Sequence, residues 1–408
     1  MSVDRAQRNT ANTDAAEVPF ASPAARGGAA HVEEPVAYDG VLLAGFGGPE
    51  GQDDVIPFLR NVTRGRGIPD ERLEEVAHHY RHFGGVSPIN AQNRALKSAL
   101  EAELARRGHR LPVYWGNRNW SPYLADAVRD AAAEGSRTLL ALATSAYSSF
   151  SSCRQYREDF AQVLTDTGLA ETITIDKVRQ FFDHPGFVAP FVDGVRDAVA
   201  GFVASGVAPA AVRVLFSTHS IPTADAGRSG PREGDELHRD FGEGGAYAAQ
   251  HLAVAEVVMA AVAASVPGAD AVGWDLVYQS RSGPASQPWL EPDVCDVIAT
   301  LPGAGAEAVV IVPLGFVSDH MEVLWDLDTE AMDAAAAAGL QAVRTPTPGV
   351  DPVYVAGLVD LIEERLTGAP AAGRPHETTL GPWFDVCRPG CCENVRAGFK
   401  PAAAGLAP

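Results

Sequence analysis

The 408-residue sequence lacks the features of a membrane-spanning or exported chain. It has no run of about 18 apolar residues, which argues against a transmembrane helix. Its most apolar segment, 253–267, is interrupted by Glu256 and predicts a helix in a protein core. Residues 1–30 contain no apolar stretch of the kind found in a signal peptide. We therefore expect a cytoplasmic protein with no membrane span.

Positive charge is also scarce, and this limits the partners that the protein can bind. The sequence has 32 lysines and arginines against 52 aspartates and glutamates, which gives a net charge of −20 at pH 7. Such an excess of negative charge argues against nucleic acid and against an anionic membrane surface as partners. An anionic substrate would need a local basic patch, and the loop 60–66 is basic.

Two common catalytic motifs are missing, and cysteine is sparse. The Gly-rich turn 45–49 does not have the GxGxxG spacing of a dinucleotide site, and no serine stands in a GxSxG elbow. These absences argue against a nicotinamide-dependent enzyme and against a serine hydrolase. In a cytoplasmic chain the five cysteines indicate metal or redox chemistry before disulfides.

Short apolar runs alternate with helical patterns along most of the chain. We predict strands over 38–43, 113–116, 138–143, 172–178, 212–216, 272–278, 308–312 and 341–344. We predict helices over 53–61, 70–82, 90–107, 122–134, 186–204, 232–265 and 351–367. Strands that alternate with helices indicate an α/β fold with parallel sheets covered on both faces. Two successive sets of about four such units predict two Rossmann-like halves, with a ligand cleft between them beyond the carboxyl ends of the strands.

The same patterns divide the chain into five segments. We expect a disordered extension over 1–37, because it is rich in Ala, Pro, Asn and Asp without periodicity. The first half then covers 38–182 and the second half covers 183–345. A closing helix follows within 346–370, and a tail that contains three cysteines occupies 371–408.

The segment 313–330 carries a row of acidic residues after a buried strand. Ser318 or Asp319 can cap a helix here, on which Glu322, Asp326 and Glu330 recur every four residues and so share one face. Aligned like charges destabilise a helix slightly, so a row of oxygen ligands leading inward would be one reason to retain them. The alternative is a solvated acidic face.

His219 follows the strand 212–216, within the turn 217–222. A histidine in such a place is often structural. Glu322 is expected at the same edge of the second sheet, and a neutral imidazole facing a carboxylate can bind Fe(II) or accept a proton.

Several segments together resemble the ferrochelatase family, which inserts Fe(II) into porphyrins. They are STHSIP, GFVSDHMEVLWD, YQSRSG, PWL and GGVSPIN, at 217–222, 315–326, 278–283, 288–290 and 84–90. All follow the family's order, and the resemblance runs from about Tyr38 to Leu366. It implies two Rossmann-like halves with the porphyrin in the cleft between them.

The resemblance also implies roles for particular residues. His219 matches the family's proton acceptor or metal ligand, and Glu322 matches the carboxylate that faces it. Asp326 and Glu330 match the acidic row that passes metal inward. Residues at the porphyrin are implied at Phe46, Ser87, Tyr156 and Trp289, to which we add Arg64 of the basic loop as a partner for propionates. Phe46 departs from relatives that have a metal-contacting tyrosine there.

Three cysteines in the tail form a second group, Cys387, Cys391 and Cys392. With a fourth thiolate they could hold an iron–sulfur cluster, and a zinc site is the alternative. Several ferrochelatases hold a 2Fe–2S cluster with one internal and three C-terminal cysteines, and Cys153 matches the internal position. Cys295 falls within a helical pattern, so we expect it in the core.

The resemblance is to bacterial enzymes of the actinobacterial type, which use coproporphyrin III. Extra propionates suit a water-exposed cleft, so we expect coproporphyrin III as the porphyrin and ferrous iron as the metal. Protoporphyrin IX is the second choice. A non-catalytic tetrapyrrole carrier and a cobalt chelatase stay as alternatives, and a downstream heme-synthesis enzyme is a possible partner.

Overall fold

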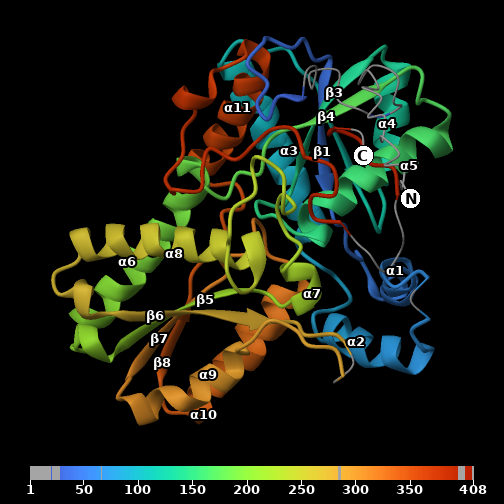
Figure 1. Ribbon diagram of the computed structural model, residues 1–408. Coiled ribbons are helices and arrows are strands. Elements are labelled where there is room, and N and C mark those ends of the chain that lie inside the picture. Colours follow the sequence, from blue (N-terminus) through green and yellow to red (C-terminus); the bar gives the residue numbers. More distant parts are fainter. Residues whose placement is uncertain (1–19, 21–27, 66, 284–285, 394–399, 407–408) are drawn as a thin grey trace, which may run out of the picture.

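The computed structural model describes residues 20, 28–65, 67–283, 286–393 and 400–406. In Figure 1 the blue-to-green elements form one α/β half and the yellow-to-orange elements form the other. Most of the predicted disordered extension, 1–37, lies outside the described residues. Its described end packs against the tail, because Val32 is buried beside Val386 and its N–H donates to Asp385 Oδ2 at 2.8 Å.

The first half is built on a four-stranded parallel sheet with the order β2-β1-β3-β4. Its strands are β1 (Gly40–Gly45), β2 (Val113–Asn117), β3 (Thr138–Ala143) and β4 (Thr174–Lys177). In this register Val41 of β1 pairs with Val113 on one side and Leu140 on the other. Strands covered on both faces read as continuous apolar runs, which is why the sequence located them closely.

The second half repeats the arrangement with the order β6-β5-β7-β8. Its strands are β5 (Val212–His219), β6 (Gly273–Gln279), β7 (Ala308–Val312) and β8 (Gln341–Arg344). In both sheets the first strand of the set is flanked by the second and third, and all pairings are parallel. The predicted α/β class with two Rossmann-like halves is therefore confirmed.

Helices cover both faces of each sheet. Those of the first half are α1 (Val55–Val62), α2 (Asp70–His82), α3 (Ile89–Arg106), α4 (Leu124–Ala133) and α5 (Gln155–Thr167). The later ones are α6 (Pro185–Ala204), α7 (Thr223–Ala226), α8 (Gly245–Ser265), α9 (Val294–Thr300), α10 (Met332–Ala337) and α11 (Pro352–Thr367). The last helix, α11, returns to the first half and packs against both α3 and α6.

Successive strand residues point to different cores, as the pleat requires. In β1, Val41 and Leu43 face the core formed with α3 and α11, whereas Leu42 faces the core formed with α4 and α5. In β7, Val310 and Ile311 divide in the same way. One core is continuous through both halves, which holds the two sheets in a fixed relation.

Two helical predictions need correction. The segment 232–265 is helical only from Gly245, because Gly242, Gly244 and Gly245 take left-handed backbone angles that end the irregular stretch before α8. The acidic segment is also not a regular α-helix. Residues Val323–Ala331 form a π-helix, η8, which is the wider i→i+5 form that occurs frequently at functional sites.

By length and composition, α8 is the one helix in the described part of the chain that is long and apolar enough to cross a membrane. Its side chains at Val254, Val258 and Val262 are instead buried in the core that both halves share, beside α6. The placement agrees with the core helix predicted over 253–267.

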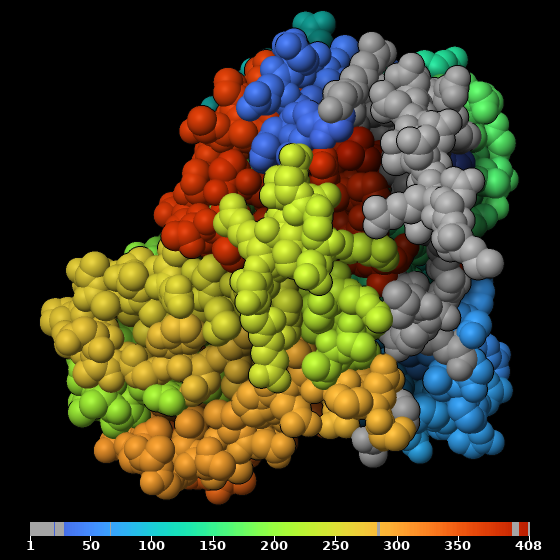
Figure 2. Space-filling view, in the orientation of Figure 1, coloured from blue at the N-terminus to red at the C-terminus, as the bar shows by residue number. Residues whose placement is uncertain are grey.

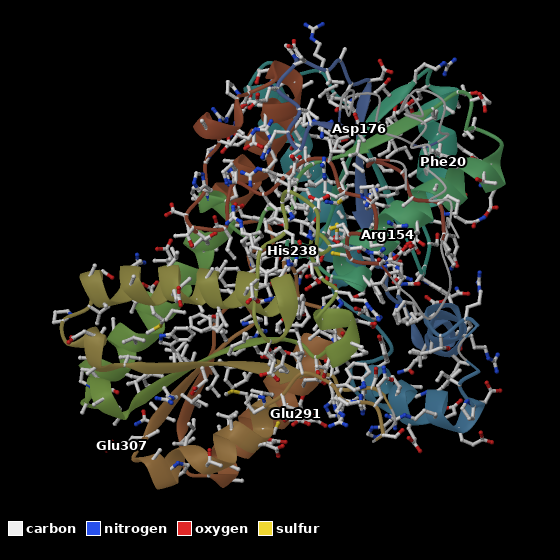
Figure 3. All side chains as sticks on the ribbon, in the orientation of Figure 1. Phe20, Arg154, Asp176, His238, Glu291 and Glu307 are labelled. Atoms are coloured by element: carbon white, nitrogen blue, oxygen red, sulfur yellow. The ribbon has the colours of Figure 1, made fainter. Side chains whose placement is uncertain are left out.

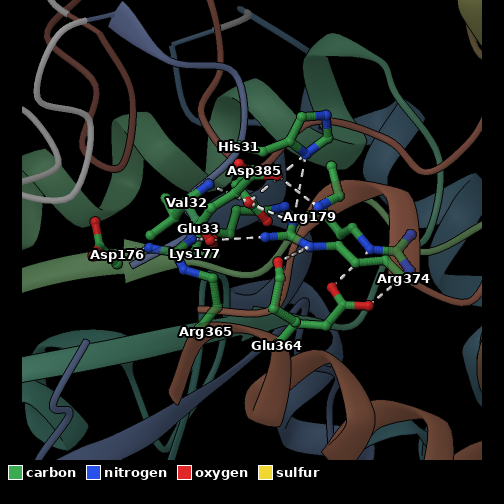
Figure 4. A network of polar contacts seen from close by, with 12 residues as sticks. His31, Val32, Glu33, Asp176, Lys177, Arg179, Glu364, Arg365, Arg374 and Asp385 are labelled. Carbon is green, nitrogen blue, oxygen red and sulfur yellow. Dashed lines mark hydrogen bonds and ion pairs between the residues drawn. The ribbon is translucent and has the colours of Figure 1, made fainter. Parts of the chain in front are cut away.

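Buried ion pairs join the first half to α11 and stabilise the tail internally, and Arg179 also donates to the Pro375 carbonyl of the tail at 2.8 Å (Figure 4). Arg179 donates to both carboxylate oxygens of Glu364 at 2.9 and 3.1 Å, and to Asp183 at 2.7 Å. Arg374 pairs with Asp385 of the tail at 2.6 Å. Removal of one partner from a buried pair costs about 3–5 kcal/mol, because the other charge is left uncompensated. The segment after α11 is therefore an integral part of the fold. The boundaries predicted between the five segments of the chain stay predictions.

Candidate active site

The candidate site lies at the carboxyl edge of the second sheet. His219 and Gln279 are the last residues of the neighbouring strands β5 and β6, and they pair with each other in the register. Glu322 follows the next strand, β7, at the start of the helical segment that contains η8. Parallel strands end at one edge, so side chains far apart in the sequence meet there.

The central contact of the site joins an imidazole to a carboxylate. His219 Nε2 lies 3.7 Å from Glu322 Oε1, and both side chains are half-buried. His219 Nδ1 lies within hydrogen-bond distance of the Ser220 carbonyl, an oxygen that can only accept. The proton of the neutral ring is therefore on Nδ1, and Nε2 carries the lone pair. That lone pair faces the region beside Glu322, where it can accept a proton or bind a metal.

The two groups shift one another's pKa. Burial alone would lower the pKa of His219, but Glu322, together with the Ser220 carbonyl and Asp326, raises it above its usual value. Burial would raise the pKa of Glu322, but His219 lowers it to about 2. Glu322 is therefore ionised at neutral pH, and His219 is a stronger base than a free imidazole.

A second histidine and a glutamine support this pair, and sequence reasoning assigned a role to neither, although it places Gln279 at the same strand edge. His320 Nδ1 accepts a hydrogen bond from the Glu322 N–H at 3.2 Å, and burial lowers its pKa, which keeps the ring neutral. Gln279 Nε2 donates to the Glu322 carbonyl at 3.0 Å. His320 lies at the helix start within the segment 315–326, and Gln279 lies at the strand end within the segment 278–283. These positions in the sequence are the signal that could have identified them.

The predicted cap of this helix is wrong. Asp319 does not bind the first turn; it pairs with Arg344 at 3.2 Å and accepts from Thr347 at 3.0 Å. His320 takes the capping role in place of Asp319 or Ser318. Because His320 also lies 3.8 Å from the Glu322 carboxylate, the start of the helix and the site are built from the same side chain.

The acidic row leads outward from Glu322. Asp326 accepts hydrogen bonds from Ser280 Oγ and, at 3.4 Å, from Gln279 Nε2, and burial raises its pKa to about 7. Glu330 is exposed and accepts from Trp325 Nε1 at 2.9 Å. The three carboxylates thus pass from a half-buried position to the surface. Asp326 in particular is held by neighbours rather than lying on a solvated face.

The other predicted porphyrin contacts lie mainly in the first half. The guanidinium of Arg118 lies 6.0 Å from the ring centre of Phe46, which is 38% exposed, and 4.7 Å from that of buried Tyr156. Ser87 is buried beside Gly48. The structure therefore gathers Phe46 and Tyr156 around one cation, which the sequence did not indicate.

Two of the predicted contacts stand apart from that group. Trp289 pairs with Pro222, in the turn that follows His219, and its indole Nε1 has no hydrogen-bond partner among the described residues. Arg64 stands on an exposed loop and donates to Asn61 Oδ1 at 2.6 Å. No contact recorded in the described part of the chain joins Arg64 to His219 or Glu322.

The four predicted cluster cysteines also come together. Their sulfurs form two close pairs, Cys153 with Cys387 at 4.0 Å and Cys391 with Cys392 at 3.8 Å, and all four are buried. Figure 3 shows sulfur atoms gathered near Arg154. Cys295 packs in a different core, beneath the second sheet. Among the described residues, no group of three or more His, Cys, Asp or Glu side chains is arranged to hold a single metal ion.

A family model described as ferrochelatase matches residues 38–366. The chain belongs to the ferrochelatase family. It is 69% identical over 391 residues to the coproporphyrin III ferrochelatase of Leifsonia xyli, an alignment that covers 95% of this chain and 99% of the relative. The proteins of the same name in Tropheryma whipplei and Streptomyces griseus are 58% and 54% identical and cover 91% and 92% of this chain and 93% and 98% of the relatives. The chain is therefore an enzyme, a ferrochelatase-type lyase.

We expect Asp326 and Glu330 to serve iron supply more than the chemical step. The double change Asp326→Asn with Glu330→Gln removes two metal-attracting charges, so the apparent KM for Fe(II) should rise several-fold while that for porphyrin changes little. Asp333→Asn, an exposed acid on the adjoining α10, is the matched control. Initial rates against Fe(II) concentration under anaerobic conditions measure the effect, and an unchanged iron dependence would support the solvated-face interpretation.

Proposed function

We propose that this chain inserts Fe(II) into coproporphyrin III to give coproheme, as a cytoplasmic step of heme biosynthesis. The main support is the His219–Glu322 pair at the edge of the second sheet, within segments of the ferrochelatase family. The relatives that cover nearly the whole chain are named for coproporphyrin III. A downstream heme-synthesis enzyme would then receive the product.

In this proposal His219 and Glu322 have different roles. Insertion of Fe(II) removes two pyrrole protons; His219 Nε2, which carries the lone pair, accepts one, and the other passes to solvent water. Glu322 supplies a carboxylate for the incoming dication, and Asp326 and Glu330 lead the metal toward it. The macrocycle must buckle to expose its nitrogen lone pairs, which uses binding energy from the porphyrin's periphery.

The porphyrin would lie mainly against the first half, with Trp289 of the second half beside it. Phe46 and Trp289 offer apolar surface for the macrocycle, while Ser87 and Tyr156 offer hydroxyls to propionates. Arg64 would supply positive charge at the exposed rim. Phe46 has no oxygen to give the metal, so metal contacts would come from the His219–Glu322 side.

Two other functions predict different results. A protoporphyrin IX ferrochelatase would use the same pair on a porphyrin with fewer propionates. A non-catalytic carrier would bind porphyrin without turnover, and the preserved pair disfavours it. Anaerobic turnover with Fe(II) and each porphyrin, followed by absorption spectra, separates the three.

We expect kcat/KM for coproporphyrin III to exceed that for protoporphyrin IX clearly. Each charge-assisted propionate contact that is lost should cost about 1.5–3 kcal/mol. That energy corresponds to roughly a ten- to hundredfold loss. Arg64→Gln should narrow this difference in kcat/KM, because it should weaken the binding of coproporphyrin III more than that of protoporphyrin IX. Equal use of both porphyrins by the wild-type enzyme would contradict the substrate assignment.

We further propose that Cys153, Cys387, Cys391 and Cys392 hold a 2Fe–2S cluster. Two thiolates on one tetrahedral metal, each about 2.3 Å from it, lie roughly 3.8 Å apart. The separations of 4.0 and 3.8 Å are therefore close enough for these four sulfurs to serve as the ligands that would hold such a cluster. The N–H of Gly230 donates to Cys392 Sγ at 3.2 Å, and hydrogen bonds to the sulfurs are one means by which a protein adjusts such a cluster. When bound, the cluster would supply one-electron chemistry and a covalent link between the tail and the helical turn 150–154 that precedes α5.

Replacement of single cysteines tests the cluster. Cys153→Ser removes one ligand, so the purified protein should lose iron and acid-labile sulfide, and protease should then cut the tail more readily. Cys295→Ser is the matched control and should keep both, because Cys295 lies in another core. Stoichiometric zinc without sulfide, or loss of the cluster from the Cys295 variant, would overturn the assignment.

A further inference from the structure

A fully buried arginine beside the cysteine site has no carboxylate partner among the residues that the structure describes. Arg157 lies on α5 four residues after Cys153 and is 2% exposed. Its Nε donates to the Ala403 carbonyl at 2.7 Å, while its Nη1 is buried without a hydrogen-bond partner in the described part of the chain. No ion pair among the described residues includes it. A buried charge is costly unless something compensates it.

Backbone contacts place this guanidinium against the cysteine segment. Residues 400–406, which we call the strap, run beside Cys387, because Gly405 forms a parallel bridge with Cys387 and the Leu406 N–H donates to its carbonyl at 3.1 Å. A Cβ on Gly405 would collide with Arg157 Nη2 and lie 3.0 Å from the Cys387 carbonyl. Arg157 therefore lies between the strap and the cysteines, in a space that the missing side chain of Gly405 leaves free.

A second buried cation approaches the same sulfurs. Lys177, at the end of β4, donates to the Val178 carbonyl at 2.9 Å and to the side chain of Gln180, but to no carboxylate in the described residues. The positive charges of Arg157 and Lys177 both act on the Cys387 thiol. Neutral thiols would leave both cations uncompensated, whereas four thiolates with two sulfides and two ferric ions would carry a net charge of −2 and so balance them.

We propose that Arg157 is the charge-compensating residue of the cysteine site and raises the reduction potential of the cluster held there. The inference rests on the cluster proposed above. Four thiolates and two sulfides outweigh the charge of two ferric ions, so the cluster is an anion that becomes more negative on reduction. A buried cation stabilises the more negative state, because Coulomb interactions are strong where water is excluded. Arg157 thus acts through charge and is not a ligand.

The test is a redox titration of the purified holoprotein, followed by the absorption and electron paramagnetic resonance of the cluster. Arg157→Gln removes the charge and should disfavour the reduced state at least about tenfold, which lowers the midpoint potential by about 59 mV for one electron. Arg157→Lys keeps the charge and should restore most of the shift.

Arg154→Gln is the matched control for the strap. Arg154 lies on the same helical segment and donates to the Lys400 carbonyl at 2.9 Å, but it pairs with Glu158 at 2.9 Å. Combined with Glu158→Gln, which removes the paired charge as well, its replacement loosens the strap without changing the net charge beside the sulfurs, so the potential should stay near that of the wild type.

The outcomes separate the two proposals. Wild-type protein without iron and sulfide would refute the cluster itself. A cluster whose potential is the same in wild type and Arg157→Gln would overturn the role of Arg157 alone, as would an equal shift in the Arg154 control. If Arg157→Gln does not retain the cluster, the iron and sulfide contents of the Arg157→Gln and Arg157→Lys variants are compared instead of their potentials. Retention in Arg157→Lys supports the need for charge, and loss in both variants shows that the shape of arginine, not its charge, is required.

Discussion

The site depends on one hydrogen bond, from His219 Nδ1 to the carbonyl of the next residue, Ser220. This bond fixes the tautomer of the ring and turns Nε2 toward Glu322, 3.7 Å away. Without it the imidazole could present an N–H in that direction, and an N–H can neither accept a proton nor bind a metal. The last residue of a strand is well suited to orient an imidazole in this way. The sheet fixes its backbone, while its side chain projects beyond the carboxyl edge of the sheet.

The repeated sheets explain why the other half matters. In each half the carboxyl ends of the strands form one edge of the sheet. One continuous core, shared by both halves, fixes the position of one sheet relative to the other. The tail adds a further connection. Arg179 binds both Glu364 of α11 and the Pro375 carbonyl of the tail, and Cys387 of the tail lies against Cys153, just before α5. The segment 225–245 covers the tail from outside, where Asp235 pairs with Arg388 and Figure 2 shows yellow-green residues against the dark red tail. A change at the cysteines would therefore reach the first half through α5, at whose start Tyr156 and Arg118 lie together.

Much of the fold could be predicted from the sequence, for a physical reason. Strands buried on both faces are short apolar runs, so β3 and β7 were located to the residue, and parallel pairing then placed His219 and Glu322 at one edge. Contacts that depend on three-dimensional proximity alone could not be predicted. Arg118 between Phe46 and Tyr156, and Arg157 between the strap and Cys387, are ordinary arginines in the sequence.

The failures share a cause as well. The acidic segment was predicted as an α-helix because its spacing of four fits either helix, and only hydrogen bonding distinguishes the wider π form. Its cap was assigned to Ser318 or Asp319 from residue preference, but Arg344 and Thr347 bind Asp319, and His320 takes its place. The irregular stretch before α8 was predicted as helix because its glycines were treated as interruptions rather than as a boundary.

The most direct test of the central claim is a single-turnover measurement on Glu322→Gln. The amide keeps the shape of the side chain but removes the charge that receives the metal and supports the basicity of His219. Coproporphyrin III is bound first and its affinity measured by fluorescence quenching, and Fe(II) is then added without oxygen. The account predicts porphyrin affinity close to that of the wild type with metallation slowed by at least about a hundredfold, a barrier increase of about 2.7 kcal/mol. Metallation at the wild-type rate would show that the His219–Glu322 pair does not carry the reaction.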